Sequence, residues 1–174
     1  RFSFSPLRLG GLYVKVAGST IAESASAYDR SLYLGDSTAA KDSYYVFERS
    51  FALSGYHPVR NLYGTVNVIA VKGATFTLPS AGITMQSGSK LKMHGAGQIA
   101  IDGTITATGN VTLDYSDVES GNTFIQGALT IDDSTMFAFP ADFAANTPYQ
   151  LCSGTLTVES KIGRAVQQEC RDRY

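Results

Sequence analysis

Acidic side chains gather in one short stretch of the sequence, between residues 114 and 122. Asp114, Asp117 and Glu119 offer oxygen ligands of the kind that Ca²⁺ prefers, and Asp132–Asp133 would add to them if it were stacked nearby. The stretch lacks the complete spacing of a calcium-binding loop. A solvated side loop or widened corner is therefore the favoured interpretation, and a calcium site is the alternative.

No sequence motif of nucleophilic catalysis accompanies these carboxylates. His57 and His94 are isolated, and neither lies beside a nucleophile motif such as GxSxG. Trp, a common platform for sugar rings, is absent from the chain. The sequence therefore predicts a protein that is not an enzyme and uses no cofactor. A polysaccharide-degrading enzyme is the alternative, with Asp102, Asp114 or Asp133 as the catalytic carboxylates.

Threonines recur in pairs around single apolar residues. Elements of this kind include Thr75-Phe76-Thr77, Thr104-Ile105-Thr106 and Thr155-Leu156-Thr157. If the apolar residue points inward, both threonines point outward, and ranks of them resemble the water-ordering face of solenoid ice-binding proteins. The elements lie far apart in the sequence, however, and threonine is a common exposed residue of strands. An ordinary strand surface is the favoured interpretation, and an ice-binding face is the alternative.

The two cysteines, Cys152 and Cys170, lie on either side of the last strand-like segment. Because neither belongs to a CxxC or Cys/His cluster, we expect one disulfide, worth roughly 3 kcal/mol, rather than zinc or redox chemistry. Two buried thiols in a reducing compartment are the alternative. The sequon Asn110-Val111-Thr112 is compatible with glycosylation of Asn110 in a secretory pathway.

The elements that carry these side chains follow a repeated unit of an apolar residue, any residue and an apolar residue, separated by glycines. The units begin at Phe76, Ile83, Leu91, Ile99, Ile105, Val111 and Leu129. The first six units start at short and similar intervals, which fits short strands whose alternate side chains point inward. With three strands in each coil, one coil takes roughly 21 residues. The sequence thus predicts an all-β fold, a parallel β-solenoid (β-helix) with about three coils up to Asp133.

The apolar positions of these units are the predicted core. They are Phe76, Leu78, Ile83, Met85, Leu91, Met93, Ile99, Ile101, Ile105, Val111, Leu113, Leu129 and Ile131. Longer, more aromatic strands before this region would also suit a β-sandwich or jelly roll, which is the alternative fold.

Three regions follow from the change in pattern along the chain. Residues 1–56 are expected to form an N-terminal β extension or cap, and residues 57–158 the solenoid. Residues 159–174 are expected to form a capping tail with a short helix, because Ile162, Ala165 and Val166 follow helical spacing. Such a tail would cover the last sheet edge or dock onto the next molecule.

Composition excludes several classes of partner. The chain has 174 residues, of which 44% are apolar and 17% charged, and its formal net charge is -1. Because the body carries no basic stripe, nucleic acid and anionic bilayers are not expected partners. No apolar run approaches the roughly 20 residues that span a bilayer, so the sequence predicts no membrane span.

The glycine-punctuated units, with Asn146–Leu151 leading into Gly154–Thr157, resemble the β-helical passenger regions of microbial surface adhesins. The resemblance is one of architecture and identifies no family. We expect a non-enzymatic extracellular or cell-surface structural protein that assembles through repeated subunit contacts into a fibre, coat or matrix. Its expected partners are further copies of the chain or neighbouring matrix proteins. The alternatives are a carbohydrate- or ice-binding module and a polysaccharide-degrading enzyme.

Overall fold

The computed structural model describes residues 8–9, 12–16, 22–23, 32–38, 41–47, 50–52, 59–70, 73–78, 82–119, 122–141 and 150–159. Within these ranges the chain forms β-strands and no helix. The strands are β1 (Arg8–Leu9), β2 (Leu12–Val16), β3 (Ala22–Glu23), β4 (Leu32–Gly35), β5 (Ser43–Phe47), β6 (Phe51–Ala52), β7 (Val59–Tyr63), β8 (Thr65–Ala70), β9 (Thr75–Leu78), β10 (Gly82–Met85), β11 (Lys90–Gly95), β12 (Gln98–Ala107), β13 (Thr112–Val118), β14 (Ile125–Asp132), β15 (Met136–Ala138) and β16 (Leu156–Glu159).

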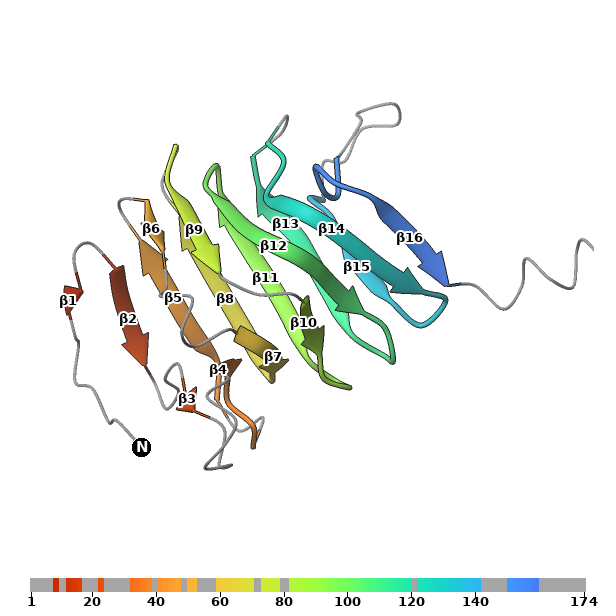
Figure 1. Cartoon of the computed structure of the whole chain (residues 1–174), viewed down its shortest axis with the longest axis horizontal. Helices are drawn as coiled ribbons and strands as arrows, with labels where there is room; N and C mark the ends of the chain where they lie inside the picture. Colours follow the sequence, from red (N-terminus) through yellow and green to blue (C-terminus); the bar gives the residue numbers. More distant parts are fainter. Residues whose placement is uncertain are drawn as a thin grey trace, which may run out of the picture.

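Successive strands wind into coils that have three sides (Figure 1). The first side contains β4, β7, β10, the C-terminal part of β12, the C-terminal part of β14, and β16. The second side contains β5, β8, β11, β13 and β15. The third side contains β6, β9 and the N-terminal parts of β12 and β14. Every pair of neighbouring strands within these sides is parallel, because the chain passes each side in the same direction once per coil.

This arrangement confirms the predicted parallel β-solenoid, of about four turns. It is not the alternative β-sandwich or jelly roll, because those folds are built from antiparallel sheets. The coils are slightly longer than predicted, since Leu91 pairs with Leu113 and Leu129 pairs with Leu156 in the next coil.

The parallel coils begin at Leu32, before the predicted boundary at residue 57. Strands β4, β5 and β6 already lie parallel to β7, β8 and β9. Only the short strands before them differ, since β2 pairs antiparallel with β5, and β3 pairs antiparallel with β4. The N-terminal extension therefore ends the parallel ladders on two sides with antiparallel strands. The predicted helix after residue 159 lies outside the described residues.

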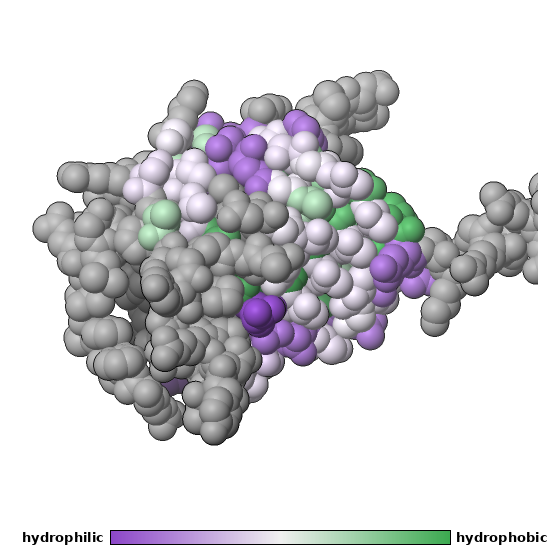
Figure 2. All heavy atoms as spheres, in the orientation of Figure 1, coloured by the Kyte–Doolittle hydropathy of each residue, from purple (hydrophilic) through white to green (hydrophobic). Residues whose placement is uncertain are grey.

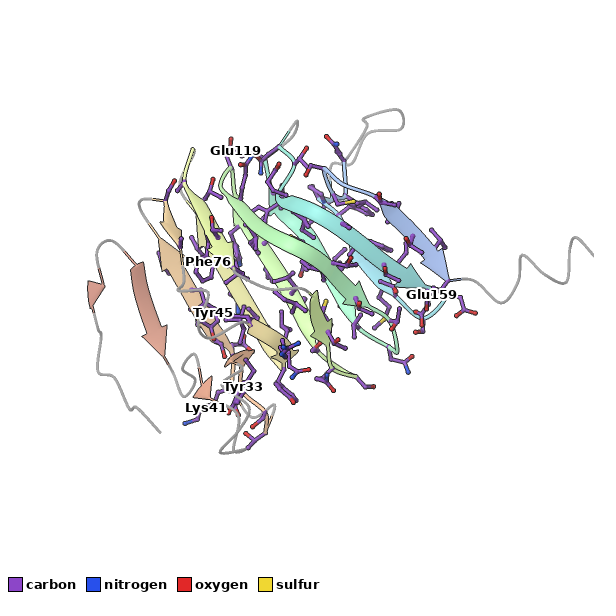
Figure 3. All side chains as sticks on the ribbon, viewed as in Figure 1. Tyr33, Lys41, Tyr45, Phe76, Glu119 and Glu159 are labelled. Carbon is purple, nitrogen blue, oxygen red and sulfur yellow. The ribbon has the colours of Figure 1, made fainter. Side chains whose placement is uncertain are left out.

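The core fills the coils along their whole described length. Of the thirteen predicted core residues, twelve are buried, and the side chain of Ile101 lies outside the description. Large side chains such as Tyr45 and Phe76 lie against the strands of neighbouring coils (Figure 3). Buried tyrosines keep their hydroxyls paired: that of Tyr45 accepts the amide of Gly35 at 2.9 Å, and that of Tyr115 donates to the carbonyl of Leu151 at 2.9 Å.

The expected side loop after Asp114 is wrong, because this stretch belongs to β13. The partners of Lys92 and His94 are Asp114 and Asp117, so β13 carries one extra residue between them and forms a β-bulge. Asp114 stabilises the bulge by accepting hydrogen bonds from the amide and hydroxyl of Ser116, at 3.0 and 2.6 Å. The extra residue disturbs the alternation of side chains and makes a strand look irregular in sequence.

Two glycines on the first side provide a matched test of coil packing. A Cβ atom added to Gly154 would lie 2.8 Å from the carbonyl group of Gly127, whereas one added to Gly82 would lie 3.5 Å from its nearest neighbour, the carbonyl oxygen of Thr104. Gly154→Ala should therefore lower the free energy of unfolding by about 1–3 kcal/mol. Gly82→Ala should be neutral or raise it by up to about 1 kcal/mol, because alanine restricts the unfolded chain.

Urea denaturation of both variants beside the wild type measures the difference. Equal effects of the two substitutions would contradict the stacking of Gly154 against Gly127.

Candidate functional site

The first side of the solenoid repeats one tetrapeptide pattern in successive coils. Its outward positions are a small residue or threonine, followed two residues later by a threonine. The four copies are Gly82-Ile83-Thr84-Met85, Thr104-Ile105-Thr106-Ala107, Ala128-Leu129-Thr130-Ile131 and Thr155-Leu156-Thr157-Val158. We call the eight outward residues, at positions 82, 84, 104, 106, 128, 130, 155 and 157, the threonine face.

The second outward position forms an unbroken ladder of four threonines. Thr84 pairs with Thr106, Thr106 with Thr130, and Thr130 with Thr157. Thr84 and Thr157 are exposed, and the two threonines between them are partly exposed. On the N-terminal side the next partner of Thr84 is Asn61, which ends the ladder. Hydroxyl and methyl groups thus recur once per coil over four coils.

The first outward position forms a second, parallel rank. Gly82 pairs with Thr104, and Thr104 pairs with Ala128. The rank continues to Thr155, whose carbonyl accepts the amide of Leu129 at 2.9 Å. Threonine therefore occupies two of the four places here, and the other two carry no side chain longer than a methyl group.

The structure separates the threonines that the sequence pattern grouped together. Thr75 and Thr77 lie in β9 on the third side, where their partners are Gln98 and Ala100. Only the pairs at 104 and 106 and at 155 and 157 belong to the threonine face, and Thr84 and Thr130 join them. The sequence signal for this face is the tetrapeptide pattern, which recurs once per coil. The signal is lost when the units of all three sides are compared without assigning each unit to its side.

Neither a charged nor an aromatic side chain occupies the eight positions of the threonine face. Over β12 and β14 the surface is correspondingly pale, with a hydropathy near neutral (Figure 2). Alternation is regular beneath it, since Ile83, Ile105 and Leu129 are all buried. The face is therefore a neutral, regularly spaced surface on a packed support.

Charged residues instead gather on the second side, where β11 and β13 lie next to each other. The Nζ atom of Lys90 lies 2.7 Å from Oδ2 of Asp114, and the Nζ atom of Lys92 lies 3.2 Å from Oδ2 of Asp117. The Nδ1 atom of His94 lies 2.9 Å from the same Asp117 oxygen. Sequence reasoning missed this cluster because its members lie on different coils.

These pairings involve carboxylates of the calcium and glycosidase alternatives. Asp114 and Asp117 each face cationic or hydrogen-bonding partners, and Asp132 accepts the amide and hydroxyl of Ser134 at 3.0 and 2.7 Å. Among the described residues, no group of three or more His, Cys, Asp or Glu side chains is placed to hold a metal ion. His57 and the side chain of Asp102 lie outside the description.

Two groups of the charged cluster have shifted pKa values. Burial lowers the pKa of His94, and the nearby carboxylate of Asp117 offsets part of this effect. Burial works to raise the pKa of Asp114, but hydrogen bonds from Lys90 and Ser116 outweigh it and hold the pKa below its usual value. Asp114 is therefore a buried carboxylate that stays ionised because its neighbours solvate it.

Cys152 is a free, buried thiol in the structure, so the predicted disulfide with Cys170 is not present. Its Sγ atom lies 3.5 Å from the carbonyl oxygen of Gly154, and burial raises the pKa of the thiol. Cys170 lies outside the described residues. Asn110 of the sequon is exposed at a corner and has a φ of 62°, and its glycosylation stays a prediction.

No protein-family model, curated protein or solved structure matches this chain. Along the stretches that the structure describes, there is no helix of the length and apolar character needed to cross a membrane. The site is therefore interpreted from its own geometry.

Asp114→Asn should destabilise the protein at neutral pH and have little effect in strong acid. The folded-state pKa of Asp114 lies below its ordinary value of 3.8, so the stabilisation is present above that value and is lost as the pH falls through the folded pKa. We expect a loss of about 1–3 kcal/mol in the free energy of unfolding at pH 7.

Urea denaturation of both proteins between pH 7 and pH 2 measures the two curves. In a Lys90→Gln background the effect of Asp114→Asn should shrink. A difference that stays constant down to pH 2 would contradict the assignment.

Proposed function

We propose that this chain is an extracellular or cell-surface protein that binds ice through its threonine face. The proposal rests on the unbroken ladder of Thr84, Thr106, Thr130 and Thr157 across four coils. A second rank, at positions 82, 104, 128 and 155, runs beside it. Together they form a two-dimensional array rather than a single row.

The spacing of this array suits a crystalline surface. Neighbouring strands in a sheet lie about 4.7–4.9 Å apart, and alternate residues of one strand, such as Thr104 and Thr106, are about 6.6–6.8 Å apart. Oxygen atoms of ice repeat at distances of the same order. Each threonine supplies a hydroxyl that donates and accepts hydrogen bonds, and a methyl group beside it. Water held along such ranks can therefore join the lattice of a growing crystal.

Rigidity favours the same function. Threonine is β-branched and has few rotamers on a strand, so its hydroxyl loses little freedom when it binds. Strands in the middle of the face are hydrogen-bonded to a neighbouring strand on both edges. Thr106 of β12, for example, pairs with Thr84 of β10 and with Thr130 of β14. A preformed array needs little ordering on contact, which matters when each single contact is weak.

A carbohydrate ligand is less well supported on this face. Sugar sites are usually concave and use aromatic rings as platforms, and the eight positions of the threonine face contain no aromatic residue. The catalytic alternative needs two carboxylates free to act on a bond. Of its three candidates, Asp114 is held by Lys90, Asp133 is exposed, and the side chain of Asp102 lies outside the described residues.

Assembly into a fibre, coat or matrix is the second candidate function, and one observation favours it. The last described strand, β16, exposes Leu156 and Val158 at one end of the solenoid. Apolar side chains left open at the end of a stack of coils are suited to contact with another β-strand. This proposal concerns the free edge and the inward side chains of β16, whereas Thr155 and Thr157 point outward as part of the threonine face, so the two proposals are tested separately.

Thr106→Lys should remove most of the ice-binding activity, because a long charged side chain in the middle of the ladder holds a crystal surface away from its neighbours. Thr77→Lys is the matched control, since Thr77 is a partly exposed threonine on β9 of the third side, and its partners Ala52 and Ala100 are uncharged. The measurement is thermal hysteresis, the gap between the melting and freezing temperatures of a seed crystal. An equal loss in both variants, or no hysteresis in the wild type, would overturn the proposal.

Completing the second rank should increase the activity. Gly82 tolerates a Cβ atom, whose nearest neighbour would be the carbonyl oxygen of Thr104 at 3.5 Å, and Ala128 is an outward position of the same rank. The double variant Gly82→Thr, Ala128→Thr would give four complete pairs of threonines. We expect a several-fold gain in inhibition of ice recrystallisation at equal protein concentration. Unchanged inhibition in a correctly folded double variant would count against the array.

A further inference from the structure

The C-terminal end of the solenoid exposes residues that belong to its core. Leu156 and Val158 of β16 pair with Leu129 and Ile131 of β14, which are 0% and 9% exposed. Leu156 and Val158 themselves are 44% and 58% exposed. Because directly paired residues of parallel strands point to the same side of a sheet, both side chains continue the core-facing ranks, and no further coil lies against them among the described residues.

The same end is visible on the surface of the molecule. Apolar residues gather beside β16 at the end of the solenoid, next to the hydrophilic Glu159 (Figures 2 and 3). Met136 of β15, which is the last strand of the second side, is 55% exposed. Its partner is the outward-facing Thr112, so Met136 lies on the outer surface of β15, and the exposure of core-facing side chains at this end is carried by Leu156 and Val158.

Strand β16 carries few of the features that stop edge strands from pairing. Edges are commonly protected by lysine, proline or a β-bulge. The sequence of β16 is Leu-Thr-Val-Glu, with one charge at its C-terminal end, and it pairs with β14 without a register shift. At the opposite end, by contrast, antiparallel strands β2 and β3 pair with the first coil.

We propose that β16 pairs with β16 of a second copy of the chain, antiparallel and about a twofold axis at Thr157. In this register Leu156 of each copy lies opposite Val158 of the other, so both apolar ranks stay on the core side. Thr157 lies opposite Thr157, and Glu159 lies opposite Thr155, which keeps the two Glu159 carboxylates from facing each other. Residues opposite each other in an antiparallel pair point to the same face, so all the pairs match.

A parallel, in-register pairing fits less well. It would place the two Glu159 side chains next to each other, and like charges in adjacent positions are destabilising. The antiparallel register is self-complementary, as a twofold interface requires. The strand is therefore suited to a closed dimer in which the threonine ladder of one copy continues into that of the other.

This inference rests on the assembly proposal and specifies one of its contacts between subunits, and it does not depend on ice binding. It commits to a second copy as the occupant of the edge. Coverage of the edge by residues 160–174 of the same chain is a separate outcome of the test.

Cross-linking by engineered cysteines tests the register. In the proposed dimer the two copies of Thr157→Cys face each other with Cα atoms about 4.5–5.5 Å apart, within the range of a disulfide. Thr155→Cys is the matched control, because its opposite residue is Glu159 and its own copy lies further along the partner strand. Under mild oxidation on a non-reducing gel, Thr157→Cys should form a covalent dimer at least tenfold faster than Thr155→Cys. Wild type in parallel corrects for Cys152 and Cys170.

Sedimentation of the full chain separates this inference from the assembly proposal. The wild type should show a dimer that Val158→Lys converts to a monomer and that the control Thr77→Lys, on the third side, leaves intact. A wild type that stays monomeric at all concentrations overturns both proposals. Association without preferential cross-linking at position 157 overturns the register and leaves assembly standing. A dimer that forms only after removal of residues 160–174 assigns the edge to the tail and overturns pairing in the intact chain.

Discussion

Parallel, in-register hydrogen bonding between successive coils is the constraint on which the rest of the structure depends. Strand β11 is bonded to β8 along its whole length and to β13 on its other edge, so its residues have defined neighbours in the coils before and after. Side chains therefore stack in ranks. Inside the solenoid the ranks are apolar, as with Val66, Leu91 and Leu113. Outside, a rank of one charge would repel itself, and Lys92 accordingly lies between Asn67 and Asp114.

The two ends follow from the same constraint, because a stack of coils has neighbours everywhere except at its first and last coil. At the N-terminal end the chain reverses direction, and β2 meets β5 as an antiparallel partner. At the described C-terminal end β16 keeps the parallel direction and is the last strand of its sheet. Exposure of Leu156 and Val158 is thus a consequence of position in the stack and not of their sequence, since their apolar partners Leu129 and Ile131 are buried one coil earlier.

Most of the core could be predicted from the sequence because, outside the bulge of β13, burial follows the alternation of side chains along a strand. Phe76 and Leu78, or Leu91 and Met93, are recognised as inward residues without knowing where the strand lies. The candidate site could not be predicted in this way, because it depends on which side of the coil each unit occupies. Thr77 and Thr106 follow the same local pattern yet lie on different sides. The ion pair between Lys90 and Asp114 likewise depends on a register that no short motif records.

Coil length and face regularity are independent in this solenoid, which bears on why the threonine face can be functional. The intervals along the chain from Thr84 to Thr106, from Thr106 to Thr130 and from Thr130 to Thr157 lengthen progressively, yet these threonines remain direct partners. Additional residues are taken up elsewhere, as in the β-bulge of β13, where Asp114 and Asp117 pair with Lys92 and His94 of the preceding coil. Packing alone would be satisfied by any outward residue at these positions. Threonine nevertheless occupies all four places of the ladder, across coils of unequal length. Its presence there is therefore explained by a role of the outer surface and not by packing of the core.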